Sequence, residues 1–182
     1  MDKGNCKPWE KISEETVFEN QYSRLNKKTF ILPHGKESDY FIHGTNEEIV
    51  TVFAITKDGK IILARQYRPG PEKVLDEIPG GLVDPGETAD QAAERELEEE
   101  TGYKGRMVHL GSTYSGAYSV KVRHCYIALD CEKMHDGKQE ENEFIDVVLM
   151  SREDFEKQMA DKTLTALEGA LMGLRYLDSI QR

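Results

Sequence analysis

A run of glutamates on one predicted helix is the feature that most constrains this sequence. Five of the seven residues from 94 to 100 are glutamate. Glu96, Glu99 and Glu100 are spaced i, i+3 and i+4, so a helix places their carboxylates on one face. Each like-charge pair at this spacing destabilises an isolated helix by roughly 0.2–0.5 kcal/mol. The cluster therefore predicts a cationic partner, and a hard divalent cation such as Mg²⁺, which takes oxygen ligands, is the first candidate.

The residues on either side of this run predict where the helix begins and ends. Thr88 is a candidate N-cap, and Gln91 three residues later fits a capping box. Gly102 is a candidate for the left-handed residue that ends the helix. The preceding loop, residues 79–86, contains three glycines and two prolines, and its glycines let backbone groups approach a ligand closely. On charge alone, the solvated face of an ordinary acidic helix remains an alternative.

The spacing of the whole segment is more specific than its charge. The segment reads Gly81-x5-Glu87-x7-Arg95-Glu96-Leu97-x-Glu99-Glu100-x-Gly102. This pattern resembles the Nudix box at every fixed position. It differs at the less strictly defined position of Tyr103, where that family usually has an aliphatic residue. The resemblance implies an α/β fold, an α/β/α sandwich around a mixed sheet. It also implies hydrolysis of a nucleoside diphosphate that is linked to another group.

Length and charge are compatible with such an enzyme. The chain has 182 residues, which suits one domain with a modest extension. Its formal net charge of −10 argues against nonspecific binding to nucleic acid or to an anionic membrane. An acidic protein can nevertheless take a polyanionic substrate, because bound cations invert the local field.

The ends of the chain and its cysteines predict a cytoplasmic location. No apolar run approaches the roughly 20 residues of a membrane-spanning helix, and the N-terminus lacks the apolar region of a signal peptide. Cys6, Cys125 and Cys131 are odd in number and have no metal-ligand spacing, so free thiols in a reducing compartment are expected and no zinc site is indicated.

Strand and helix patterns cover most of the chain. An Asp-Gly pair at residues 58–59 predicts a hairpin between strands at 48–56 and 60–67. Further strands are predicted within 9–46 and at 107–114, 120–129 and 144–150. Ser151 fits the start of one helix, and residues 163–177 fit the last one.

The resemblance divides the chain into an N-terminal strand arm, residues 1–46, and a Nudix hydrolase domain, residues 47–182. Such an arm is similar to that of the ADP-ribose and nucleoside diphosphate sugar pyrophosphatase branch, where it builds a homodimer and shapes the substrate pocket. Residues 64–68 and 75–81 resemble the strand and loop that precede the box in that branch, and residues 140–148 resemble its distal acidic motif.

The same resemblance assigns roles to individual residues. Two or three Mg²⁺ ions, with Mn²⁺ as an alternative, would be held by Glu96, Glu100 and the Gly80 carbonyl. Glu99 would be either a further metal ligand or a residue that hydrogen-bonds to a ligand. In the distal motif, Glu141 is the candidate general base and Glu143 the candidate metal ligand. A plain polar loop is the alternative for that motif.

Three arginines and one further glutamate complete the predicted site. Glu87 and Arg95 are expected to support the carboxylates rather than touch substrate. Arg68 is the candidate contact to the diphosphate or terminal sugar, because a guanidinium offers paired donors to phosphate oxygens. A surface arginine is the alternative for Arg68, and Arg65 is a weaker candidate.

The segment after the box leaves the substrate open. The ADP-ribose branch usually carries a proline about fifteen residues beyond the box, and residues 114–120 contain none. Tyr118 is instead similar to a tyrosine of dinucleoside polyphosphate hydrolases. A nucleoside diphosphate sugar such as ADP-ribose or GDP-mannose is the expected substrate. The alternatives are a dinucleoside polyphosphate or other nucleotide pyrophosphatase, or a sensor that binds a nucleotide sugar without cleaving it; the intact box disfavours the sensor.

Overall fold

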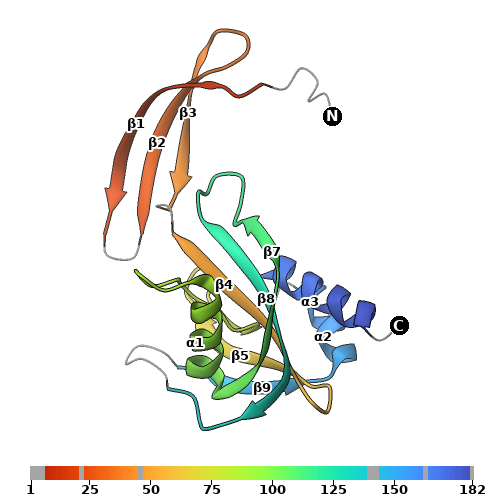
Figure 1. Ribbon diagram of the computed structural model, residues 1–182. Coiled ribbons are helices and arrows are strands. Elements are labelled where there is room, and N and C mark those ends of the chain that lie inside the picture. Colours follow the sequence, from red (N-terminus) through yellow and green to blue (C-terminus); the bar gives the residue numbers. More distant parts are fainter. Residues whose placement is uncertain (1–6, 21–22, 45–46, 139–143, 162–163, 181–182) are drawn as a thin grey trace. The chain divides into compact units, whose positions relative to one another are not determined.

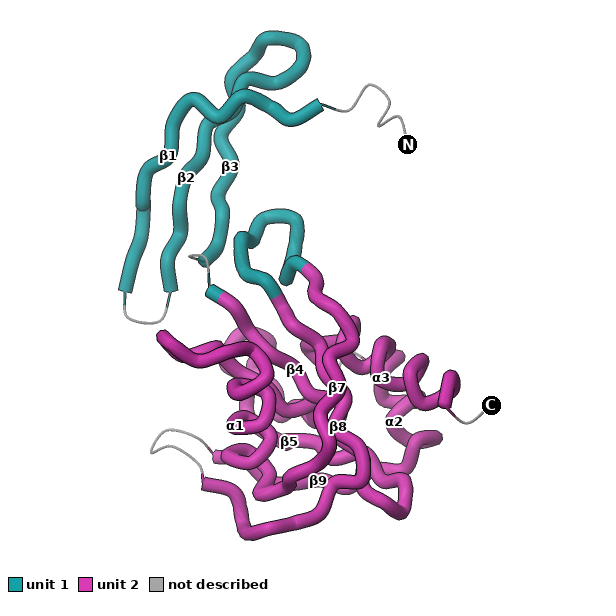
Figure 2. Tube along the Cα trace, viewed as in Figure 1, with its two compact units in different colours: residues 1–47, 114–122 teal, residues 48–113, 123–182 magenta. Residues whose placement is uncertain are grey.

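The chain forms two compact units, which Figure 2 shows in different colours. The computed structural model describes residues 7–20, 23–44, 47–138, 144–161 and 164–180. The first unit contains the residues up to Glu47 together with Tyr114–Val122, and the second contains Glu48–Thr113 and Arg123–Arg182.

The second unit is built on a mixed sheet of six strands (Figure 1). The strand order is β6-β5-β4-β8-β7, and β9 also pairs with β5. The strands are β4 (Glu48–Thr56), β5 (Ile61–Arg68), β6 (Lys73–Glu77), β7 (Tyr103–Tyr114), β8 (Val122–Lys133) and β9 (Asp146–Met150). The predicted hairpin is confirmed, because β4 and β5 pair in antiparallel register across the turn at Gly59.

Three helices in the described residues cover the two faces of this sheet: α1 (Ala89–Thr101), α2 (Arg152–Gln158) and α3 (Leu167–Ile180). The predicted boundaries of α1 are confirmed. The Thr88 side chain accepts from the Gln91 amide, the Gln91 side chain accepts from the Thr88 amide, and Gly102 ends the helix with φ of 74°. Ser151 caps α2 by accepting from the amide of Asp154. Within the described residues, every helix is too short or too polar to cross a membrane.

Alternate residues of β4 face two separate apolar cores. Val50 and Val52 pack in a core with Leu97 of α1, whereas Phe53 packs in a core with Leu174 of α3. A strand that is covered on both faces carries the near-continuous apolar sequence of β4. The predicted sandwich, with α1 on one face of the mixed sheet and α2 and α3 on the other, is therefore confirmed (Figure 1).

Several element boundaries differ from the sequence prediction, among them the end of β8, which is Lys133 rather than residue 129. The strand predicted at 107–114 already begins at Tyr103, which is 8% exposed and packs in the core beside α1. The last helix begins at Leu167 rather than at residue 163. Its first helical hydrogen bond runs from the amide of Ala170 to the carbonyl of Ala166, and the hydroxyl of Thr165 is bonded to Glu77 instead.

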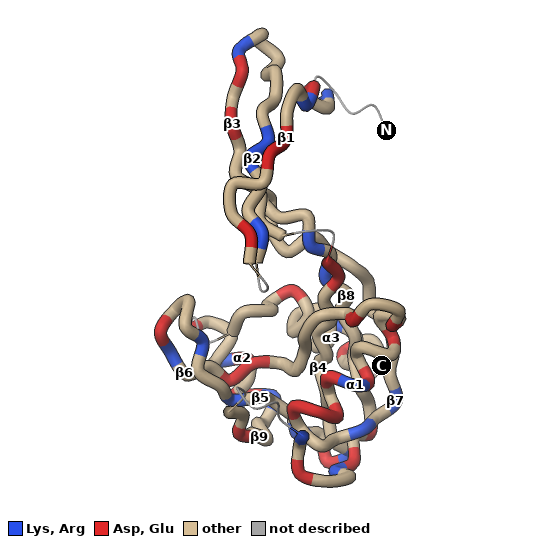
Figure 3. Tube along the Cα trace, turned by 90° about the vertical axis from the view of Figure 1, so that its left-hand side faces the viewer, with Lys and Arg blue, Asp and Glu red and all other residues tan. Residues whose placement is uncertain are grey.

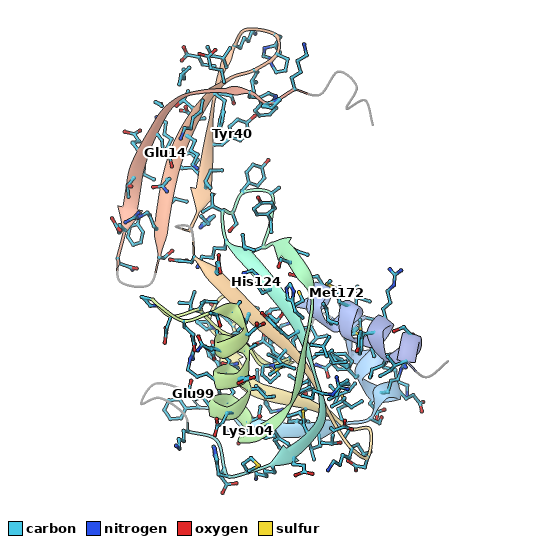
Figure 4. All side chains as sticks on the ribbon, in the orientation of Figure 1. Glu14, Tyr40, Glu99, Lys104, His124 and Met172 are labelled. Carbon is cyan, nitrogen blue, oxygen red and sulfur yellow. The ribbon has the colours of Figure 1, made fainter. Side chains whose placement is uncertain are left out.

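The first unit is a three-stranded antiparallel sheet with the order β1-β2-β3. Its strands are β1 (Glu10–Glu19), β2 (Arg24–Ile31) and β3 (Glu37–His43). Residues 114–122 join this sheet, which the sequence did not indicate: the amide of His43 donates to the Tyr118 carbonyl at 2.9 Å, and the Tyr40 ring, labelled in Figure 4, stacks on that of Tyr118. Every residue of β1 is exposed in this unit.

Close packing of α3 on the sheet predicts a specific stability loss. A Cβ on Gly173 would lie 2.3 Å from Cγ of the buried Phe53 ring. We therefore expect Gly173→Ala to lower the free energy of unfolding by about 1–3 kcal/mol, as overpacking does, although alanine is the better helix former. Urea denaturation measures this change. Leu171→Ala, at a position 51% exposed on the same helix, is the control and should change stability far less; equal stability of Gly173→Ala and wild type would contradict the close approach.

Candidate functional site

The loop before α1 lies directly along β4. The amide of Val52 donates to the Pro79 carbonyl at 2.8 Å, and the amide of Val50 donates to the Gly81 carbonyl at 2.9 Å. A Cβ on Gly80 would lie 2.2 Å from the Val50 carbonyl oxygen, so only glycine fits there. Because backbone groups alternate in direction along an extended segment, the polar groups of Gly80 point away from β4.

Two of the predicted ligand carboxylates lie against these glycines. The amide of Gly80 donates to Oε2 of Glu100 at 3.1 Å, and Glu100 is only 6% exposed. Oε1 of Glu96 lies 2.2 Å from the position that a Cβ on Gly81 would take. The consecutive glycines thus make room for two carboxylates that the helix spacing places on one side.

Arg95 joins the loop to the helix at the centre of this cluster. Its Nε and Nη2 donate to the two carboxylate oxygens of Glu87 at 3.0 Å each, and its Nη1 donates to Glu96 at 2.8 Å and to Glu99 at 3.0 Å. Its Nη2 also donates to the Leu82 carbonyl at 2.9 Å. The bond to Glu87 is the main cause that raises the pKa of Arg95, and the same bond lowers the pKa of Glu87. The guanidinium therefore offsets part of the acidic charge that Figure 3 shows along α1.

The donor atoms at this place suit a hard divalent cation. They are the carboxylates of Glu96 and Glu100 and, by its direction, the carbonyl of Gly80, and Mg²⁺ and Mn²⁺ take such oxygen ligands. Glu99, labelled in Figure 4, has a side chain that is 44% exposed and bonded to Arg95. In the part of the chain that the structure describes, no three His, Cys, Asp or Glu side chains already form a ligand set.

The predicted base Glu141 and the predicted ligand Glu143 lie outside the described residues. The loop that leads to them is described as far as Lys138. A Cβ on Gly137 would lie 2.6 Å from the carbonyl oxygen of Glu99. His135 contacts Glu98 through Nε2 at 3.0 Å. This loop therefore runs along the C-terminal end of α1, the end that carries Glu99 and Glu100.

An open groove of about 240 Å³ begins at the two glycines. Its lining includes Gly80, Gly81, Arg68, Arg123 and Thr165. The two glycines that contact the carboxylates and two arginines therefore line one groove, which suits a ligand with several negative charges.

A larger cavity of about 380 Å³ lies between α1 and β7. It is lined by Glu94, Glu98 and Lys104 among others. Nζ of Lys104 already pairs with Glu98 at 2.8 Å, and neither glycine of the loop reaches this cavity. The groove at Gly80 and Gly81 is therefore the better candidate for the functional site.

The two predicted substrate arginines are separated by the structure. Arg68 lines the groove, and its Nε donates to Glu77, which is 1% exposed and also accepts from the Thr165 hydroxyl. Arg65 donates through two nitrogens to Asp76 and is not among the residues of the groove. The two arginines are three residues apart on β5, so they lie on opposite faces of the strand.

Arg123 is a groove residue that the sequence analysis did not single out. It lies near the start of β8, and β8 pairs with β4. The strand β4 also forms backbone hydrogen bonds with the loop that contains Gly80 and Gly81. An arginine shortly before the apolar residues 125–129 was the available signal. Its place in the groove depends on the strand order, which no local pattern indicates.

Known proteins resemble this chain in sequence and in fold. The NUDIX domain model matches residues 45–167. The ADP-ribose pyrophosphatase of Bacillus subtilis (strain 168) is 32% identical over 146 residues, which are 79% of this chain and 78% of that protein. The methanol dehydrogenase activator of Bacillus methanolicus is 30% identical over 156 residues, 84% of each chain. The crystal structure of an ADP compounds hydrolase matches with a TM-score of 0.81 at 22% identity, covering 96% of this chain and 95% of that one, and shows a common fold.

Proposed function

This chain belongs to the Nudix family, and we propose that it is a pyrophosphohydrolase that cleaves the diphosphate bond of a nucleoside diphosphate sugar. ADP-ribose is the first candidate substrate, because the Bacillus subtilis relative is an ADP-ribose pyrophosphatase; GDP-mannose or a similar compound is the next. The products would be a nucleoside monophosphate and a sugar phosphate. The observation that carries the proposal is the packing of Glu96 and Glu100 on Gly80 and Gly81, at one end of a groove that also contains Arg68.

The carboxylates at the glycines are the proposed metal ligands. Glu96, Glu100 and the Gly80 carbonyl would hold Mg²⁺ or Mn²⁺, in two or three sites, with Glu99 and Glu143 as further candidate ligands. Such ions neutralise diphosphate charge and lower the pKa of bound water. Arg95 and Glu87 keep the loop and the helix in register through their paired hydrogen bonds.

Glu141 is the proposed general base, which removes a proton from the attacking water. Support comes from Gly137, four residues earlier, which lies against the backbone of Glu99 and Glu100. Arg68 is the proposed contact to the diphosphate or the terminal sugar. The pairing of Arg65 with Asp76, away from the groove, makes Arg65 the weaker candidate.

A substrate panel with Mg²⁺ tests this function. We expect nucleoside monophosphate to be released from one or more nucleotide sugars, and release to depend on the divalent ion. Preferred cleavage of dinucleoside polyphosphates would favour that alternative instead. Tight binding of a nucleotide sugar without any product would identify a sensor and would contradict the enzyme.

A cytoplasmic location is part of the proposal. Cys125 and Cys131 are buried free thiols, which suits a reducing compartment. The acidic net charge of −10 also favours a small-molecule substrate over nucleic acid or a membrane surface.

We also propose that the arm, residues 1–46, packs on a second copy of the chain and helps to form each active site. Within the first unit, Trp9, Phe18 and Phe41 are 44%, 53% and 52% exposed. An uncovered apolar sheet with a free edge strand is an aggregation hazard, and a twofold partner is the commonest cover.

Deleting residues 1–45 should therefore abolish the dimer and raise the KM for the nucleotide sugar, while α1 and its carboxylates stay folded. Light scattering and steady-state kinetics measure the two effects. Deleting only residues 1–6, which precede β1, is the control and should leave the dimer intact. A full chain that is monomeric and active at nanomolar concentration would contradict the dimer.

A further inference from the structure

Arg123 lines the groove and pairs with one acidic residue in the part of the chain that the structure describes. Its side chain is 15% exposed, and its Nη1 donates to Oε1 of Glu168 in the first turn of α3 at 2.9 Å. Its Nε is buried and has no hydrogen-bond partner among the described residues. The guanidinium is thus oriented by Glu168 at Nη1, while its buried Nε lacks an acceptor among the described residues.

A purely structural arginine would be expected to use its donors more fully. Arg65 illustrates this, because both its Nε and its Nη2 donate to Asp76. A guanidinium is always charged and carries five N–H donors, and a buried donor without a partner lowers stability. Arg123 lines the groove, so an anionic ligand there would supply acceptors for its guanidinium.

Arg123 and the other groove arginine come from different strands and line the same groove. Arg68 is on β5 and Arg123 is on β8. The loop of Gly80 and Gly81, which pairs with Val50 and Val52 of β4, lines the same groove. Two long side chains can therefore contact one diphosphate group that lies in this groove.

We propose that Arg123 is a second substrate-binding arginine, which donates to the non-bridging oxygens of the diphosphate, and that Glu168 positions its guanidinium. This inference rests on the proposed function, because it names a further contact of the same substrate. Arg123 raises the affinity for the substrate, whereas the carboxylates of α1 and the distal loop serve the chemical step.

Substitution of Arg123 tests this assignment through the split between KM and kcat. With ADP-ribose and Mg²⁺, Arg123→Gln should raise KM by roughly 10- to 100-fold, the usual effect of removing a hydrogen bond to a charged group, and should change kcat much less. Arg123→Lys keeps the charge but loses the paired donors, so its KM should be intermediate. Arg175→Gln, on the exposed side of α3 and outside the groove, is the control and should match wild type.

Glu168→Gln should raise KM by a smaller factor. In the background of Arg123→Gln it should have almost no further effect, because Glu168 acts through Arg123. Additive effects of the two substitutions would contradict the positioning role. A rescue of the Arg123→Gln defect by Arg123→Lys would support a charge contact and would not follow from loss of packing alone.

Calorimetry with inorganic pyrophosphate and Mg²⁺ separates this inference from the proposed function. Wild type should bind pyrophosphate, and a folded Arg123→Gln or Arg123→Lys variant should bind it more weakly, whether or not any nucleotide sugar is cleaved. An inactive wild type would overturn the proposed function, yet the binding comparison would still decide the role of Arg123. Failure of wild type to bind pyrophosphate, or unchanged Kd and KM in both variants, would overturn the inference.

Discussion

Glu141→Gln is expected to lower kcat by roughly 10²–10⁴-fold with little change in KM, the usual range for loss of a general base. Glutamine keeps the size of the side chain but cannot accept the proton of the attacking water. The described loop before it passes Gly137, which lies against the end of α1 that carries the proposed ligand Glu100. Steady-state kinetics on the best nucleotide sugar, at saturating Mg²⁺, measures the effect.

The neighbouring acidic residues serve as controls for this assignment. Glu140→Gln should remain close to wild type, and Glu143→Gln should show a raised requirement for Mg²⁺ because Glu143 is a proposed ligand. An inactive Glu140→Gln beside an active Glu141→Gln would shift the assignment of the base by one residue. If neither substitution affects kcat, the base lies elsewhere, and the acidic face of α1 is the next place to test.

Local signals in the sequence were sufficient to predict α1, the proposed metal-binding helix. The capping box of Thr88 and Gln91 and the left-handed Gly102 determine both ends of α1 within the helix itself. The spacing of Glu96 and Glu100 then decides which way their carboxylates point. The hairpin of β4 and β5 was predictable for the same reason, because the turn at Gly59 needs only its own residues.

Features that depend on contacts between distant segments could not be predicted from such signals. The role of Gly80 in making room beside the Val50 carbonyl is visible only once the loop pairs with β4. Arg123 enters the groove because β8 is the neighbour of β4. The helix α3 begins after Thr165, whose hydroxyl is bonded to the buried Glu77, 88 residues away. No periodicity or motif reports pairings over such distances.

The second large effect is expected at the helix carboxylates. Glu100→Gln, and to a similar degree Glu96→Gln, should abolish turnover, because glutamine keeps the size of the side chain and removes the charge that the cation requires. The amide of Gly80 can still donate to the glutamine oxygen at position 100, so the loop should stay in place. Kinetics over a range of Mg²⁺ concentrations, together with calorimetric titration of Mn²⁺, measures the loss of metal binding directly.

Stability in the absence of metal separates this effect from misfolding. Removing one of the clustered charges relieves repulsion on α1, so the metal-free Glu100→Gln variant should unfold at the same temperature as wild type or slightly above it. Glu94→Gln, on the exposed side of the same helix, is the matched control and should retain normal turnover and Mn²⁺ binding. If Glu100→Gln keeps more than about a tenth of the wild-type kcat at saturating Mg²⁺, the loss is below ~1.4 kcal/mol, and Glu100 is then not a ligand of the catalytic metal.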